Sequence, residues 1–114
     1  MSSDKAAPTD IDGAQSMPLT GLVNYQDGAV VSRVVLKRDR GNVTLFAFDE
    51  GQGLSEHTSP FTALIQSIEG EAEGTIAGRP VALKTGDVVL LPADQPHAVK
   101  AATRFKMMLI MIRS

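Results

Sequence analysis

Two glycine-bounded stretches decide the fold of this 114-residue chain: residues 51–70, GQGLSEHTSPFTALIQSIEG, and residues 86–101, GDVVLLPADQPHAVKA. Each begins with glycine, which turns favour because glycine adopts positive φ freely. Each also contains one of the two histidines of the chain, His57 and His97. In the second stretch a run of valine and leucine follows the glycine, which is typical of a strand. The two stretches therefore predict strands joined by tight turns, with one histidine on each stretch.

Short apolar segments separated by turn residues continue on both sides of these stretches. Gly70 and Gly86 lie where hairpins require positive φ or a close approach of two backbones. Many short strands with glycine in their turns are typical of an antiparallel sandwich or barrel. The expected fold class is therefore all-β. The segments expected to be strands, within residues 86–101 and on both sides of the two stretches, cover residues 29–36, 43–48, 72–77, 81–84, 88–91, 97–101 and 104–112.

Residues 60–69 fit a helix about as well as a strand. Phe61, Leu64, Ile65 and Ile68 recur at helical spacing. Ser59 and Pro60 are suitable for the start of such a helix, and Gly70 for its end. Because the segments around it are all expected to be strands, we predict a strand here.

Composition and charge exclude several functional classes. Hydrophobic residues make up 43% of the chain and charged residues 21%, an ordinary globular balance. The 11 lysines and arginines against 13 aspartates and glutamates give no basic excess, so we expect no nucleic-acid partner. The absence of cysteine excludes disulfides, thiolate metal sites and cysteine nucleophiles. The sequence thus predicts one globular domain.

The first residues are small and polar, so residues 1–16 are expected to be a flexible tail and residues 17–114 the barrel domain. This tail has no apolar core of the kind a signal peptide needs. The longest apolar run, residues 107–112, is far shorter than a membrane span. We therefore expect a cytoplasmic protein with no membrane partner.

The two stretches together resemble the two signature motifs of the cupin superfamily. The first motif is glycine, five residues, H-x-H, three or four residues, glutamate, six residues and glycine. Residues 51–70 keep this spacing, with His57, Ser59 and Ala63 at the positions of the two histidines and the glutamate. The second motif is glycine, five residues, P-x-G, two residues, histidine, three residues and asparagine, which residues 86–101 match through His97. The resemblance implies a small RmlC-like cupin, a double-stranded β-helix or jelly-roll barrel.

In metal-binding cupins the four motif positions hold one divalent ion, and the resemblance places His57, Ser59, Ala63 and His97 there. Two of the four metal-binding side chains, including the carboxylate, are replaced in this chain. A hydroxyl is a poor ligand for such ions, and stable catalytic sites have three protein ligands. We therefore expect no resident metal cofactor, and regard His57 and His97 as candidates for a weakly bound divalent ion.

The four positions are instead expected to line a ligand pocket inside the barrel. His57 and Ser59 are two residues apart, so in a strand their side chains face the same side. The resemblance implies that His97 converges with them from a neighbouring strand. Glu56 would point to the opposite face, and Asp94, at the turn-glycine position, tolerates left-handed backbone. No catalytic residue is assigned, because no interior carboxylate is evident to orient a histidine base.

Three functions remain open. The first is binding of a small organic molecule in the pocket without a metal. The second is a metal-dependent enzyme of the dioxygenase, decarboxylase or isomerase type. The third is a structural or regulatory dimeric module. Both faces of residues 107–112 are apolar, which favours a strand covered on both sides and is compatible with a homodimer.

Overall fold

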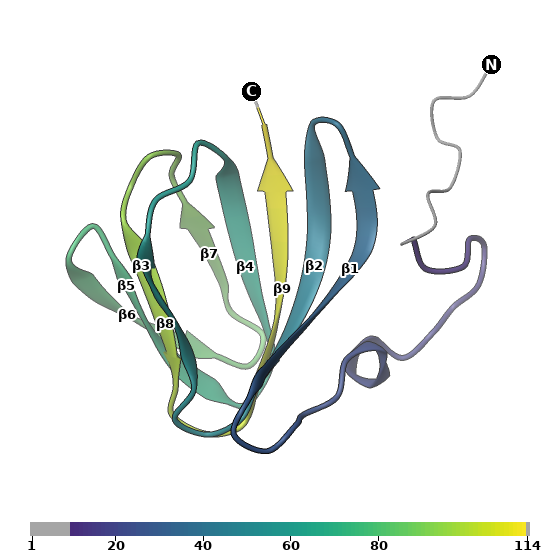
Figure 1. The fold of residues 1–114 in the computed structure, drawn as a ribbon, viewed down its shortest axis with the longest axis horizontal. Coiled ribbons are helices and arrows are strands. Elements are labelled where there is room, and N and C mark those ends of the chain that lie inside the picture. The colour runs from purple at the N-terminus through teal and green to yellow at the C-terminus, as the bar shows by residue number, and fades with distance from the viewer. Residues whose placement is uncertain (1–9, 114) are drawn as a thin grey trace.

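The structure, a computed structural model, describes residues 10–113. Two antiparallel sheets face each other and diverge toward one end (Figure 1). One sheet has five strands in the order β1-β2-β9-β4-β7, and the other has four in the order β3-β8-β5-β6. This confirms the predicted all-β class. The elements are the 3-10 helix η1 (Leu19–Leu22), β1 (Val30–Arg38), β2 (Gly41–Phe48), β3 (Gly53–His57), β4 (Thr62–Glu69), β5 (Glu71–Ile76), β6 (Arg79–Lys84), β7 (Val88–Leu91), β8 (His97–Ala101) and β9 (Phe105–Ile112).

The ambiguous segment is a strand, as predicted. In β4 the side chains of Ala63, Ile65 and Ser67 are buried, alternating with more accessible neighbours. β4 lies between β9 and β7, so its backbone groups bond to strands on both sides. The helical spacing arose because the outer face of β4 is also apolar, through Leu64 and Ile68. Tertiary pairing, which local spacing does not encode, decided the conformation.

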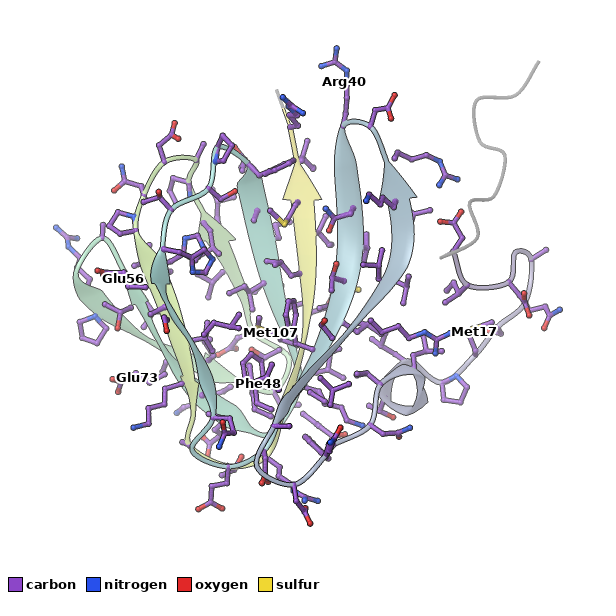
Figure 2. The ribbon with its side chains drawn as sticks, in the orientation of Figure 1. Met17, Arg40, Phe48, Glu56, Glu73 and Met107 are labelled. Atoms are coloured by element: carbon purple, nitrogen blue, oxygen red, sulfur yellow. The ribbon has the colours of Figure 1, made fainter. Side chains whose placement is uncertain are left out.

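The main core fills the space between the sheets. Phe48 and Met107 point into this space, whereas Glu73 lies on the outer side of the four-stranded sheet (Figure 2). Phe48 and Phe105 are fully buried, and their ring centroids are 5.7 Å apart. This cluster also includes residues from β4, β5, β6, β7 and β8, so it holds the two sheets together.

A second core covers the outer face of the five-stranded sheet near β1 and β2. Leu45 and Val35 are buried there by side chains of the preceding N-terminal segment, including Leu19 and Leu22. Met108 packs against this outer cluster whereas Met107 belongs to the main core, because neighbouring residues of a strand face opposite sides. Figure 1 shows this segment lying outside β1 and β2.

The turns have the backbone conformations that the sequence predicts. Gly70, between β4 and β5, has φ of 78°, and Gly86, before β7, has φ of 91°. Asp94, in the turn between β7 and β8, also has positive φ, at 66°. These residues let consecutive strands reverse within a few residues.

The expected tail lies largely outside the described residues. Of residues 1–16 the structure describes 10–16, where Ile11 donates a backbone hydrogen bond to the Val35 carbonyl oxygen at 2.9 Å. Within residues 10–113 no helix has the length and apolar character that crossing a membrane requires.

Candidate functional site

The two histidines meet at one end of the four-stranded sheet. His57 is the last residue of β3 and His97 the first of β8, and the two are register partners in this antiparallel pair. Their Nε2 atoms are 3.1 Å apart, and the ring centroids are 4.3 Å apart with an interplanar angle of 68°. The cupin resemblance implied that His97 converges with His57 and Ser59, and the structure brings His57 and His97 together.

A β-bulge directs His57 toward its partner. The register of β3 and β8 shifts between Leu54 and His57, so that Ser55 and Glu56 lie opposite the single residue Ala98. In a regular strand His57, three positions after Leu54, would face the opposite side. The extra residue of a bulge reverses this alternation. Leu54 and His57 therefore line the same cavity.

Backbone carbonyls fix the orientation of both rings. The Nδ1 atom of His57 lies 2.7 Å from the Ser55 carbonyl oxygen, and that of His97 lies 3.1 Å from the Gln95 carbonyl oxygen. A carbonyl oxygen only accepts hydrogen bonds, so each Nδ1 must carry its hydrogen. The Nε2 atoms therefore face each other 3.1 Å apart, a position that suits a shared proton, a hydrogen-bond donor or a cation between them.

The loops beside the histidines are also connected. The backbone N–H of Asp94 donates to the carbonyl oxygen of Ser59 at 2.8 Å. The backbone N–H of Ala77 donates to the carbonyl oxygen of Pro96, also at 2.8 Å. The first bond joins the loop after β3 to the loop before β8. The histidines are thus positioned by paired strands and by a bond between the loops that follow and precede them.

A small apolar cavity lies beside the pair. Its volume is about 20 Å³, close to the space for a single water molecule. The side chains around the barrel axis therefore nearly fill the interior that we expected to be a ligand pocket. His57 is exposed, so the pair is accessible from solvent. The cavity is lined by Leu54, His57, Ile65, Leu91, His97, Ala98, Val99, Met107 and Leu109.

Two of the four residues expected in the pocket do not line this cavity. Ser59 lies beyond the end of β3, where its Oγ accepts a hydrogen bond from the Phe61 N–H at 3.1 Å. The expectation that Ser59 shares a strand face with His57 is therefore wrong, because the strand ends at His57. Ala63 is 6% exposed and belongs to the main core on β4.

The apolar lining was not predicted residue by residue, although one signal was available. Ile65 follows Ala63 by two positions and Val99 follows His97 by two, so strand alternation places both on the inner face. Leu54 offered no such signal, because the bulge in β3 breaks the alternation.

The residues present do not complete a tight metal site. Among residues 10–113 no group of three or more histidines, cysteines, aspartates or glutamates is arranged to hold a metal ion. His57 and His97 supply two imidazoles, one fewer than the three protein ligands usual in catalytic zinc sites. A resident ion would therefore need further ligands from solvent or from a bound molecule, in addition to the two imidazoles.

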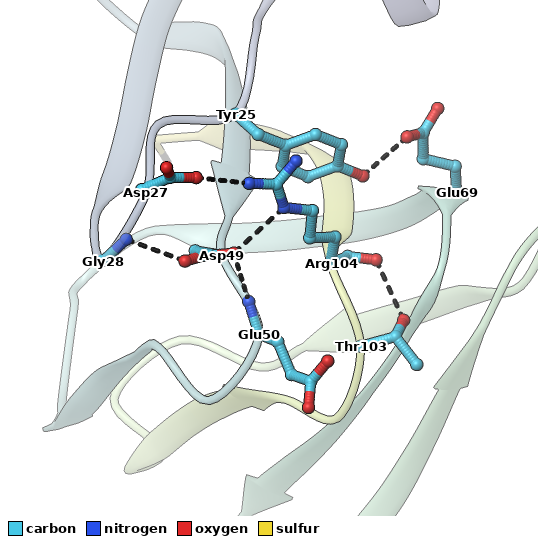
Figure 3. A network of polar contacts seen from close by, with 8 residues as sticks. All are labelled: Tyr25, Asp27, Gly28, Asp49, Glu50, Glu69, Thr103 and Arg104. Carbon is cyan, nitrogen blue, oxygen red and sulfur yellow. Dashed lines mark hydrogen bonds and ion pairs between the residues drawn. The ribbon is translucent and has the colours of Figure 1, made fainter.

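A second polar network, at the other end of β8, has a structural role (Figure 3). Arg104 bonds through Nε to Asp49 Oδ1 at 3.0 Å and through a terminal nitrogen to Asp27 at 2.6 Å. The Gly28 N–H and then the Arg104 guanidinium hold the pKa of Asp49 below its ordinary value. Burial, and then the hydrogen bond to Glu69, raise the pKa of Tyr25. These contacts join the segment before β1 to the loops after β2 and β8.

The chain is similar to known proteins with this architecture. The cupin domain family matches residues 44–113. A conserved protein of unknown function from Streptococcus pyogenes is 29% identical, with a TM-score of 0.90, covering 97% of each chain. A cupin superfamily protein from Desulfitobacterium hafniense is 28% identical, with a TM-score of 0.88, covering 96% of this chain and 100% of its own.

A cupin 2 conserved barrel domain protein from Leptotrichia buccalis is 35% identical, with a TM-score of 0.79, covering 83% of this chain and 46% of its own. No curated protein matches the sequence. The family match spans most of the strands, including those that bear His57 and His97. Because this match covers more than half of the chain, the protein belongs to the cupin domain family.

Proposed function

We propose that this cupin binds a small organic molecule at the His57–His97 pair. The supporting observation is the contact of two Nε2 atoms whose rings are oriented by backbone carbonyls, beside an apolar cavity. An alcohol or phenol hydroxyl donates a hydrogen bond to an Nε2 lone pair, whereas a carboxylate accepts one from an Nε2–H, and in either case the oxygen lies near both rings. The apolar part of the molecule is directed toward the cavity.

The size of the cavity limits the ligand. About 20 Å³ accepts a group no larger than a water molecule or a methyl group unless side chains move. The remainder of the molecule therefore lies outside the cavity, where His57 is exposed. A compact molecule with one polar group fits this arrangement better than a large ligand enclosed by the barrel.

The proposal is a binding function and includes no reaction step. In a catalytic histidine of the serine-protease kind, a carboxylate accepts the Nδ1 hydrogen and stabilises the imidazolium. Here neutral carbonyls of Ser55 and Gln95 take that position. The rings are thus oriented but lack the charge compensation that efficient proton transfer uses.

The test is a titration followed by NMR of the histidine side chains. Phenol, n-butanol and butyrate are added separately to the untagged protein while the imidazole ¹H–¹⁵N correlations are recorded. We expect saturable shifts of both Nε2 signals with at least one probe, and loss of binding in His57→Leu and His97→Leu. Absence of shifts with all three probes, or equal binding by the leucine variants, would contradict the proposal.

Matched controls come from the residues that hold the rings. Ser55→Ala and Gln95→Ala keep the backbone carbonyls that accept from each Nδ1 and remove only exposed side chains. We expect both variants to bind the probes as the parent does. A loss of binding in these variants would show that the side chains, rather than the oriented imidazoles, recognise the probe.

A weakly held divalent ion is the second candidate, favoured by the same convergence of two Nε2 atoms. Imidazole nitrogen is a suitable ligand for zinc, copper, iron and nickel. Elemental analysis of untagged protein distinguishes the candidates. About one such ion per chain, lost in His57→Ala, would favour the metal-dependent alternative over metal-free binding. If neither probe nor ion binds, the nearly filled interior favours a structural or regulatory module.

We also propose that the protein acts in the cytoplasm. The chain has no cysteine and so gains nothing from an oxidising compartment, where disulfides form. Fractionation of cells that produce the untagged protein would test this location.

A further inference from the structure

The tripeptide Asp-Gly-Ala occurs twice in the chain, at residues 12–14 and at residues 27–29. Aspartate followed by glycine can rearrange, because the backbone nitrogen of the glycine attacks the side-chain carboxyl carbon. Glycine leaves this nitrogen unobstructed, since it has no Cβ atom. The two copies have the same local chemistry, so a difference between them must come from the structure around each.

The first copy lies in an exposed stretch between two attached parts of the N-terminal segment. Before it, the Ile11 N–H donates to a carbonyl oxygen of β1 at 2.9 Å, and after it η1 packs against the outer core. Residues 12–16 are exposed. Among residues 10–113, neither Asp12 nor Gly13 takes part in a hydrogen bond or an ion pair. No contact therefore holds the reacting groups of this copy in place.

The backbone at Asp12 and Gly13 also has room to form a ring. A Cβ atom added to Gly13 would meet nothing within 4 Å. Both residues border an open groove of about 420 Å³ between the N-terminal segment and the strands β1 and β2. The Gly13 nitrogen can therefore approach Asp12 Cγ without displacing a neighbour and without breaking a hydrogen bond.

In the second copy the same two groups are held by separate partners (Figure 3). The Gly28 N–H donates to Asp49 Oδ2 at 2.7 Å, and Arg104 donates through a terminal nitrogen to Asp27 Oδ1 at 2.6 Å. A backbone hydrogen bond of 3.1 Å closes the turn that contains both residues. The attacking nitrogen and the carboxylate must therefore both leave their partners before they can react.

We propose that Asp12 is a site of spontaneous isomerisation to isoaspartate, and that the fold protects Asp27 from the same reaction. A bond forms between the Gly13 nitrogen and Asp12 Cγ, and the carboxyl hydroxyl leaves with the amide hydrogen as water. Water then opens the resulting succinimide. Opening at Cγ restores aspartate, whereas opening at the backbone carbonyl carbon leaves the chain joined through Cγ, which is isoaspartate.

The product differs from the parent in shape but not in mass. The backbone gains one methylene at residue 12, and the former backbone carbonyl becomes a free α-carboxylate. Because residues 12–16 are exposed, this carboxylate is accessible in the folded protein. The partner that fits it is a methyltransferase that esterifies isoaspartyl α-carboxyl groups with S-adenosylmethionine as the methyl donor.

Storage of the full folded chain at physiological pH and temperature tests the proposal. Methylation by an isoaspartyl methyltransferase with labelled S-adenosylmethionine measures total isoaspartate, and electron-transfer fragmentation of peptides locates it. We expect isoaspartate to form at residue 12 at least about tenfold faster than at residue 27, because a hydrogen bond to the Asp49 carboxylate must first break at Gly28.

Two controls separate the fold from the sequence. In concentrated urea the chain is unfolded, and the two copies should form isoaspartate at similar rates. Gly13→Ala should suppress the reaction at residue 12 in the folded chain, because a side chain hinders the nitrogen. Gly13 lacks a positive φ and has nothing close to its Cβ position, so this variant should fold as the parent does, which circular dichroism checks.

Asp49→Ala tests the protection of Asp27 directly. It removes the acceptor of the Gly28 N–H, so isoaspartate at residue 27 should form faster than in the parent. The proposal would be overturned by equal rates at residues 12 and 27 in the folded parent, or by absence of isoaspartate at residue 12. It would also be overturned if the difference between the two residues persisted in urea, because the sequence rather than the fold would then set the rates.

Discussion

Replacing Gly70 with alanine should destabilise the protein much more than the same replacement at Gly86. Both residues have positive φ, 78° and 91°, so an alanine is strained at either position. They differ in what a Cβ atom would meet. At Gly70 it would collide with the carbonyl oxygen of Arg104 and lie against Thr103 Oγ1, whereas at Gly86 nothing lies within 4 Å.

The expected losses of free energy of unfolding follow from two contributions, the backbone strain at positive φ and the collision of the new Cβ atom. Left-handed backbone costs an alanine roughly 1–2 kcal/mol, so Gly86→Ala should lose about that much free energy of unfolding. At Gly70 the loop of residues 103–104 must also shift, and overpacking of this kind adds roughly 1–3 kcal/mol. With roughly 4–5 °C per kcal/mol for a domain of this size, we expect Tm to fall about 4–10 °C at Gly86 and about 8–25 °C at Gly70.

Thermal unfolding followed by circular dichroism measures both variants, and urea unfolding gives the free energies independently. Gly78→Ala is a further control, because Gly78 has φ of 79° and nothing within 4 Å of a Cβ atom. The Tm of Gly78→Ala should therefore be close to that of Gly86→Ala. Equal Tm values for all three variants would refute the reasoning, because they would show that the turn at Gly70 is not packed against the Arg104 backbone.

Three other changes have definite expected outcomes. His97→Leu should lower Tm by less than about 8 °C in thermal unfolding, since leucine fills similar space and loses mainly the bond to the Gln95 carbonyl; a larger loss would mean that the pair holds the fold. Ser67→Ala should raise the free energy of unfolding by about 1 kcal/mol in urea, because Ser67 Oγ is buried with no hydrogen-bond partner among the described residues. Asp49→Asn should lower Tm at pH 7, and the difference from the parent should shrink as the pH falls below 3.8, the ordinary pKa. The lowered pKa of Asp49 means that its ionised form stabilises the fold above that pH and that this contribution is lost on protonation. A difference that persists at pH 2 would contradict this cause.

The spacing of the turns and of the two histidines was sufficient to predict much of the site. Gly70 and Gly86 marked the turns, and family spacing placed His57 and His97 together. The spacing could not predict that β3 ends at His57, which removes Ser59 from the strand face. It also gave no sign of the bulge before His57, because a bulge depends on how two distant strands align.

The sequence by itself determined the all-β class and the strand order along the chain, because alternating apolar residues and positive-φ turn residues are local properties. Tertiary structure alone decided that residues 62–69 form a strand, since pairing with β9 and β7 outweighed a helical spacing of apolar side chains. It also decided how little space remains beside the histidines. Side chains from five different strands fill that region, and the free volume among them depends on their packing in three dimensions.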